Sequence, residues 1–154
     1  MDLLTLTQER FCWPGLHAAC KQSAIEELLD RLLAENALPA HAREEMLDAV
    51  LQRERRLSTG LQHGIAIPHG TTGHVTREVA GLGIFPEGVP FESVDGSTTQ
   101  IVILLITPED LRHRHVTNLA HLARQLLQPD LRCALLAARS QEDVLSAIRR
   151  VGEG

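Results

Sequence analysis

Residues 101–106 read Ile-Val-Ile-Leu-Leu-Ile and are followed by Thr-Pro-Glu-Asp at 107–110. A continuous apolar run of this length is typical of a central strand that is covered on both faces. Apolar content and flanking turn residues predict further extended segments before this run. They are 57–61, 64–67 closed by Pro68, 79–85, and a short edge strand around 89–91. The run at 101–106 therefore predicts the centre of a sheet of about five strands.

Two helices are predicted on the N-terminal side of these strands. Ser23 followed by Glu26 is a capping-box pattern, and the leucines after it recur at helical spacing up to about Asn36. Pro39 suits the first turn of a second helix, which the apolar pattern extends to about Arg53.

Three helices are predicted on the C-terminal side of the central strand. The first begins at Thr107-Pro108, with threonine as the cap and proline in the first turn. A shorter one follows from Pro129 to about residue 138, and Ser140 with Asp143 caps the last. Helices before, between and after a few strands predict an α/β fold, with residues 1–154 forming a single domain.

Bulk properties exclude several classes of protein. The 154 residues are 44% hydrophobic and 23% charged, as in an ordinary globular domain. The formal net charge of −5 argues against a nucleic-acid binder. No apolar run approaches the roughly 20 residues of a membrane helix, and no signal-peptide pattern opens the chain. Three cysteines without metal spacing favour reduced thiols and a cytoplasmic protein.

The stretch 53–70 carries the chemistry, because it places His69 between Pro68 and Gly70 at the end of an apolar segment. Proline fixes the backbone on one side, and glycine permits close approach of a partner on the other. A neutral imidazole can act as a nucleophile toward phosphorus. From these residues alone, a loop histidine that only fills space is favoured over a nucleophile.

The sequence around His69 resembles the active-site signature of type-2 enzyme IIA domains of the bacterial phosphotransferase system, which include fructose, mannitol and nitrogen-regulatory (PtsN-like) proteins. The resemblance covers most of the chain and is carried by the following segments: Arg53-Glu54, Ser58-Thr59-Gly60-Leu61, 64–70, 88–91, 94–96, 101–108, His115, Leu119 and 135–140. It implies the fold of this family, a single-domain mixed β-sheet of about five strands with helices on both faces.

The resemblance also implies a reaction and its residues. His69 corresponds to the histidine whose Nε2 accepts a phosphoryl group from phospho-HPr or from the nitrogen-branch relative of HPr. Arg53 corresponds to an arginine beside the phosphoryl group, and His115 to a second histidine that donates a hydrogen bond to it. His115 could instead be a core histidine on an apolar stripe; a helix beginning only near His113 would favour the site role.

Supporting roles are expected for Ser58, Thr59 and Gly70 in the loop around the phosphate. Two positions depart from the family pattern, Gln62 and His63. His63, His69 and His74 could suggest a metal site, but their spacing fits no standard zinc pattern. We therefore expect no metal and no cofactor, with His63 adding a titratable group near the site.

Three functions follow from the resemblance. The first is a phosphocarrier that passes the group from His69 to a IIB domain for sugar uptake. The second is a PtsN-like regulator whose affinity for a target protein depends on phosphorylation. The third, a binding module that no longer transfers phosphate, is disfavoured because Arg53, His69 and His115 are all present. None of the three requires nucleic acid or insertion into a membrane.

Overall fold

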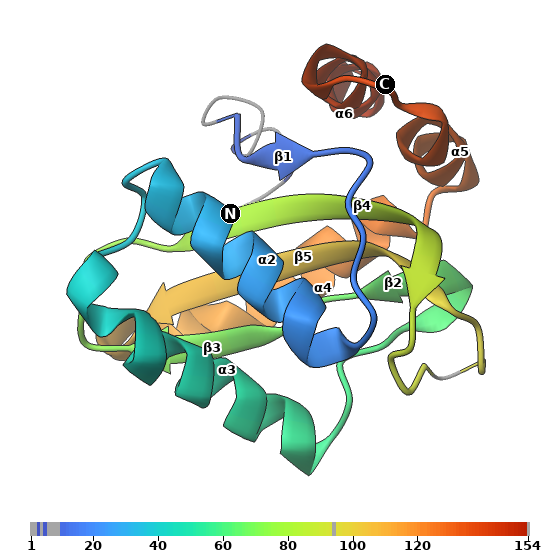
Figure 1. The fold of residues 1–154 in the computed structure, drawn as a ribbon. Coiled ribbons are helices and arrows are strands. Elements are labelled where there is room, and N and C mark those ends of the chain that lie inside the picture. The colour runs from blue at the N-terminus through green and yellow to red at the C-terminus, as the bar shows by residue number, and fades with distance from the viewer. Residues whose placement is uncertain (1–2, 4, 6–9, 94, 154) are drawn as a thin grey trace.

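The computed structural model describes residues 3, 5, 10–93 and 95–153, with the backbone alone at 112–116 and 151–153. Its sheet has the strand order β1-β4-β5-β2, and β3 also pairs with β5 (Figure 1). The strands are β1 (Cys12–Trp13), β2 (Ile65–Ala66), β3 (His69–Thr72), β4 (Val79–Val89) and β5 (Thr99–Pro108). The predicted mixed sheet of five strands is thus confirmed.

The apolar run 101–106 lies in β5 at the centre of this sheet. β4 pairs with it antiparallel on one side, whereas β2 and β3 pair with it in parallel, one after the other, on the opposite side. His69 stands opposite Leu105 in this register. The central strand therefore fixes the position at which the chain emerges from β2 and presents His69.

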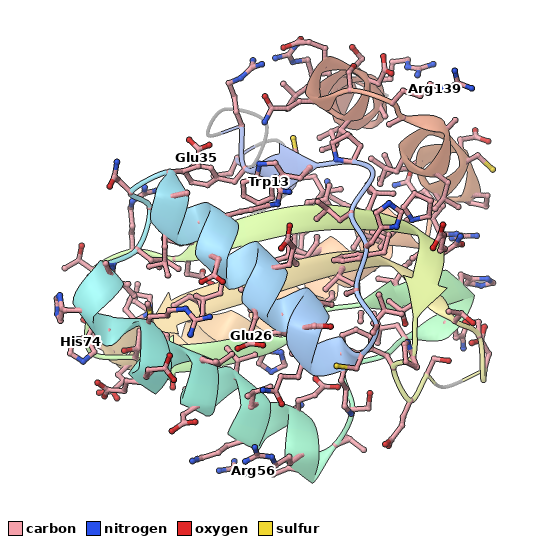
Figure 2. All side chains as sticks on the ribbon, viewed as in Figure 1. Trp13, Glu26, Glu35, Arg56, His74 and Arg139 are labelled. Atoms are coloured by element: carbon pink, nitrogen blue, oxygen red, sulfur yellow. The ribbon has the colours of Figure 1, made fainter. Side chains whose placement is uncertain are left out.

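Helices cover both faces of the sheet, as predicted (Figure 1). One face carries α2 (Lys21–Ala34) and α3 (Arg43–Arg56), and the other carries α4 (Arg112–Leu126), α5 (Pro129–Ala137) and α6 (Gln141–Glu153). Each face has its own buried apolar core. Charged side chains such as Arg56 and Arg139 are exposed on the outside of these layers (Figure 2).

Several predicted boundaries are wrong. The segment 57–61 forms no strand beyond an isolated bridge between Gly60 and Ala66, although Leu61 N donates to the Ile65 carbonyl oxygen and Ile67 N donates to the Thr59 carbonyl oxygen. β5 continues through Pro108, since β3 pairs with its end, so Thr107-Pro108 does not begin a helix. A 3-10 turn (Glu109–Leu111) follows, and α4 begins at Arg112. Long-range pairing overrode the local signals.

The other predicted helix starts are confirmed or lie within a few residues of the observed ones. Cys20, not Ser23, is the N-cap of α2, and Ser23 completes the capping box three residues later. Pro39 precedes a short 3-10 turn (Ala40–Ala42) before α3 begins. Ser140 caps α6 as predicted, because its Oγ accepts a hydrogen bond from the backbone N–H of Asp143 at 3.1 Å.

Gly70 allows α3 to lie directly against β3. A Cβ atom at position 70 would meet Val50 Cγ2 at 3.0 Å and the Val50 backbone nitrogen at 3.1 Å. We expect Gly70→Ala to lower the free energy of unfolding by about 1–3 kcal/mol, because backbone of a packed helix cannot yield easily. Chemical denaturation measures this, with Gly73→Ala as the control, since its added Cβ would have only ordinary contact with Glu109. Equal stability of both variants would contradict the close packing.

Candidate functional site

His69 is the first residue of β3 and only 8% of it is exposed. Its Nδ1 lies 2.8 Å from the backbone carbonyl oxygen of Ile67. A carbonyl oxygen can only accept a hydrogen bond, so Nδ1 must carry the proton. In the neutral ring the lone pair is then on Nε2. The backbone of the preceding residues thus selects the tautomer in which Nε2 is the nucleophilic atom.

The surroundings of His69 favour the neutral ring. Burial lowers the pKa of His69 below its usual value of about 6.5, and the positive charge of Arg53 lowers it further. The hydrogen bond to Ile67 and the charge of Glu54 act in the opposite direction without reversing the shift. The ring is therefore neutral at pH 7, as a nucleophile must be.

A titration of His69 tests this electrostatic balance. Because the pKa of His69 is lowered in the folded chain, less than half of the ring is protonated at pH 6.5. Folding stability should then decrease as the pH falls from about 6.5 toward the lowered pKa, since the unfolded chain binds more protons there. We expect NMR titration of His69 to give a pKa below that of the histidines in the urea-unfolded chain. A His69 pKa at or above theirs would contradict the assigned environment.

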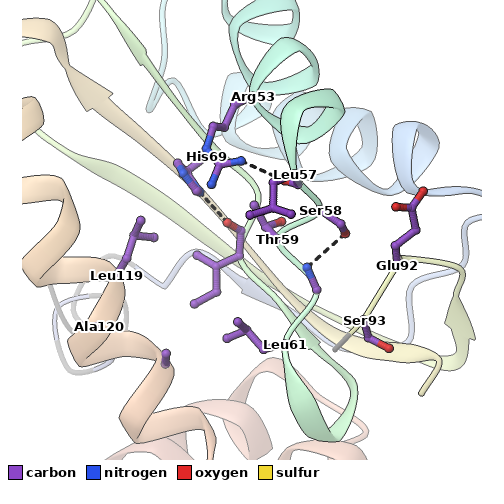
Figure 3. Close-up of a pocket in the computed structure, with 13 residues that line it drawn as sticks. Arg53, Leu57, Ser58, Thr59, Leu61, His69, Glu92, Ser93, Leu119 and Ala120 are labelled. Atoms are coloured by element: carbon purple, nitrogen blue, oxygen red, sulfur yellow. Dashed lines mark hydrogen bonds between the residues drawn. The ribbon is translucent and has the colours of Figure 1, made fainter. Parts of the chain in front are cut away.

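His69 opens onto a cavity of about 600 Å³ between the loop after α3 and helix α4 (Figure 3). Figure 3 shows Leu57 to Leu61 on one wall and Leu119 and Ala120 on the opposite wall. Glu92 and Ser93 form a third side. Leu57 is 70% exposed at the rim. The histidine is thus reached through an open, largely apolar hollow.

Arg53 lies at the C-terminal end of α3 and lines this cavity together with His69. Its Nη1 donates a hydrogen bond to the Leu57 carbonyl oxygen at 2.9 Å (Figure 3). Arg53 and His69 also line a second hollow of about 310 Å³ on the other side, which includes Gly70. A guanidinium in this position can bind the oxygens of an anion at His69.

Ser58 and Thr59 face the buried carboxylate of Glu54. Oε1 of Glu54 accepts hydrogen bonds from Ser58 Oγ and from the Thr59 backbone nitrogen, both at 3.0 Å, and Oε2 accepts one from Thr59 Oγ1 at 2.6 Å. These hydroxyls therefore anchor the loop to the end of α3. Sequence reasoning placed Glu54 in the motif but did not assign it this role.

His115 lies in the first turns of α4, one helical turn before the cavity residue Leu119. The start of α4 at Arg112 matches the later helix start that favours a site role for this histidine. The side chain of His115 is outside the part of the chain that the structure describes.

Two other histidines that the sequence singled out, His63 and His74, do not line the cavity. His63 is exposed in a 3-10 turn, where its backbone N–H donates to Asp95 Oδ2 at 3.1 Å, and it does not line the hollow around His69. His74 Nε2 lies 2.5 Å from Glu45 Oε2. Within the residues described, no three potential ligands gather into a metal site. The expectation that His63 titrates beside the site therefore has no geometric support.

A neutral, buried nucleophilic histidine beside an arginine, on a mixed α/β sheet, defines a site suited to carrying an anionic group. Residues 5–151 match the family "Phosphoenolpyruvate-dependent sugar phosphotransferase system, EIIA 2". The chain therefore belongs to this family, and membership gives it a phosphocarrier or regulatory role.

Sugar-specific EIIA components and nitrogen regulatory proteins are both similar to the chain along nearly its whole length. The fructose-specific EIIA component of Haloferax volcanii is 34% identical, over 99% of this chain and 97% of the relative. A nitrogen regulatory protein of Bradyrhizobium diazoefficiens is 29% identical, over 96% and 95%. The crystal structure of the nitrogen regulatory protein IIA-Ntr from Neisseria meningitidis superposes with a TM-score of 0.79 at 27% identity, covering 90% of this chain and 93% of that one.

No helix in the described part of the chain is long and apolar enough to cross a membrane.

Proposed function

We propose that His69 is the phosphoryl acceptor of a IIA-type phosphocarrier, taking the group from a phosphohistidine on HPr or its nitrogen-branch relative. The observation that carries this proposal is the 2.8 Å contact between His69 Nδ1 and the Ile67 carbonyl, which leaves the lone pair on Nε2. Residues 1–154 act as one IIA domain in this account, in the cytoplasm where such donors act.

The transfer is an in-line displacement at phosphorus. The lone pair of His69 Nε2 forms the new N–P bond while the bond from phosphorus to the donor histidine breaks, and its electrons return to the donor ring. The Nδ1 proton stays in place, and the Ile67 carbonyl oxygen that accepts it stabilises the positive charge developing on the ring. Neither a metal nor a cofactor is needed for this step.

Arg53 supplies the compensating positive charge. A phosphoryl group adds about −1.5 to −2 charge at neutral pH, in a chain whose formal net charge is already −5. The guanidinium of Arg53 is the described cationic group that lines both hollows beside His69. His115, in the first turns of α4, is proposed as a second donor to the phosphoryl oxygens, and Ser58, Thr59 and Gly70 as supports of the surrounding backbone.

The apolar rim of the cavity suits a protein donor and a protein acceptor. Leu57 is exposed on one side, and Leu119 and Ala120 face it from α4. Burying such a rim against a partner would exclude water from the transferring group. The donor is proposed to be HPr or its nitrogen-branch relative, and the onward partner a IIB domain or a regulated protein.

Two experiments distinguish a sugar-transport carrier from a regulatory protein. The chain is incubated with HPr, or its nitrogen-branch relative, carrying radioactive phosphate, and then with isolated IIB domains. Acid-labile label on the chain supports the carrier function, and its appearance on a IIB domain supports sugar transport. Label that stays on the chain, with target binding that changes on phosphorylation, supports the regulatory function suggested by the nitrogen-regulatory relatives. A chain that takes no label from either donor contradicts the carrier proposal.

A further inference from the structure

Glu54 is a buried carboxylate next to the proposed phosphoryl site. Only 3% of it is exposed, and three hydrogen bonds from Ser58 and Thr59 end on its two oxygens. An ionised carboxylate without compensation is costly to bury. The sequence neighbour that could supply positive charge, Arg53, instead donates to the Leu57 carbonyl oxygen.

The nearby cation comes from a different helix. Lys21 Nζ lies 3.8 Å from Glu54 Oε1 and 4.0 Å from Glu92 Oε1, and its side chain is 30% exposed. Lys21 is the only lysine in the chain. It is also the first residue of α2, whose first turn has no acidic residue, and a positive charge at a helix N-terminus is unfavourable for the helix. Its position is therefore better explained by its acidic neighbours than by α2 itself.

These contacts form a continuous path to the site. Lys21 contacts Glu54, Glu54 holds the backbone and hydroxyls of residues 58–59, and the adjoining Leu57 carbonyl binds Arg53 beside His69. We propose that Glu54 and Lys21 are positioning residues for phosphoryl transfer, which hold the 57–60 loop, and through it Arg53, in the geometry that receives the phosphoryl group. This inference rests on the proposed acceptor role of His69.

Lys21 also links the 57–60 loop, through Glu54, to a second segment that lines the cavity. Its second acidic neighbour, Glu92, lines the cavity together with Ser93. The segment at Glu92 approaches the 57–60 loop at Gly60, where a Cβ atom would lie 3.0 Å from the Glu92 carbonyl oxygen. The ammonium group of Lys21 therefore contacts both the carboxylate that holds the 57–60 loop and the carboxylate of the segment next to that loop.

Removing the charge of Glu54 and removing the charge of Lys21 should shift the pKa of His69 in opposite directions. The negative charge of Glu54 raises the pKa of His69, against the larger lowering by burial. Glu54→Gln removes that charge and should lower the pKa further, whereas Lys21→Met leaves the carboxylate uncompensated and should raise it. The other charged groups lining the hollows around His69 are Arg53, Arg56 and Glu92, which both variants retain. The charged side chains at 112–115 of α4 lie outside the described part and are also unchanged.

The test compares four variants for the rate of phosphoryl transfer from phosphorylated HPr or its nitrogen-branch relative and for the NMR pKa of His69. We expect a loss of rate of about tenfold or more for Glu54→Gln, about threefold to tenfold for Lys21→Met, and recovery in Lys21→Arg. Arg31→Met is the matched control, because it also removes an ion pair from α2, to Glu27, and neither residue lines the hollows beside His69. It should transfer at the wild-type rate.

The possible results separate the two proposals. Wild-type chain that accepts no phosphoryl group contradicts the proposed function itself. Wild-type activity with unchanged rates in both Lys21→Met and Glu54→Gln overturns the positioning role. Pure loss of structure would slow both variants and move the His69 pKa in the same direction, and this outcome also overturns it. Opposite pKa shifts with slower transfer and rescue by Lys21→Arg support it.

Discussion

Replacing His69 with alanine should abolish acceptance of a phosphoryl group, lowering the rate by about 10³-fold or more. The reason is the loss of the nucleophilic Nε2, because His69 is the only histidine on the described cavity wall. Incubation with radioactively phosphorylated donor protein measures the effect.

The matched control is His74→Ala. His74 is hydrogen-bonded to Glu45 and does not line the cavity, so this variant should accept the phosphoryl group like the wild type. His69→Gln provides a second check, because an amide keeps hydrogen-bonding capacity and much of the volume but is no nucleophile. Label that persists in His69→Ala would place the acceptor on another histidine, and His115 would be the first to examine.

The second large effect is expected at Arg53. Arg53→Ala should slow phosphoryl transfer by about 10²–10³-fold, because removal of a preorganised charge that faces a developing anion costs this much in comparable sites. Arg53→Lys should recover only part of the rate, since an ammonium cannot reproduce a planar, bidentate guanidinium. Single-turnover transfer from the phosphorylated donor measures both variants.

A control and an independent readout accompany the Arg53 experiment. Arg55 is an exposed residue of the same helix and lines neither hollow, so Arg55→Ala should leave the rate unchanged. Because the charge of Arg53 lowers the pKa of His69, that pKa should rise in Arg53→Ala. Equal rates for Arg53→Ala and Arg55→Ala would exclude the proposed role of Arg53.

The layered fold could be predicted from the sequence because its strongest elements are locally encoded. The apolar run at 101–106 identified the central strand, and helical spacing with Pro129 and Ser140 identified the C-terminal helices. The short strands were harder to predict from the sequence. β1 has two residues, and β3 contains His69, a glycine and two threonines, so both exist only because long partner strands lie beside them.

In the site, too, some features could be predicted from the sequence and others depend on contacts made only in the folded chain. Resemblance to a family drew attention to His69 and Arg53, and the structure brings these two residues to one cavity. The tautomer of His69 depends on the Ile67 carbonyl, which no side-chain pattern encodes. The contact of Lys21 with Glu54 joins two helices that are distant in sequence, so it becomes visible only in the folded chain.

The most direct test of the account is to locate the phosphoryl group in the phosphorylated chain. Long-range ¹H–¹⁵N NMR spectra distinguish the two ring nitrogens of a phosphohistidine. The structure predicts phosphorus on Nε2 of His69, with the proton remaining on Nδ1 and donated to the Ile67 carbonyl oxygen. A phosphoryl group on Nδ1 of His69, or on any other residue, would contradict the account.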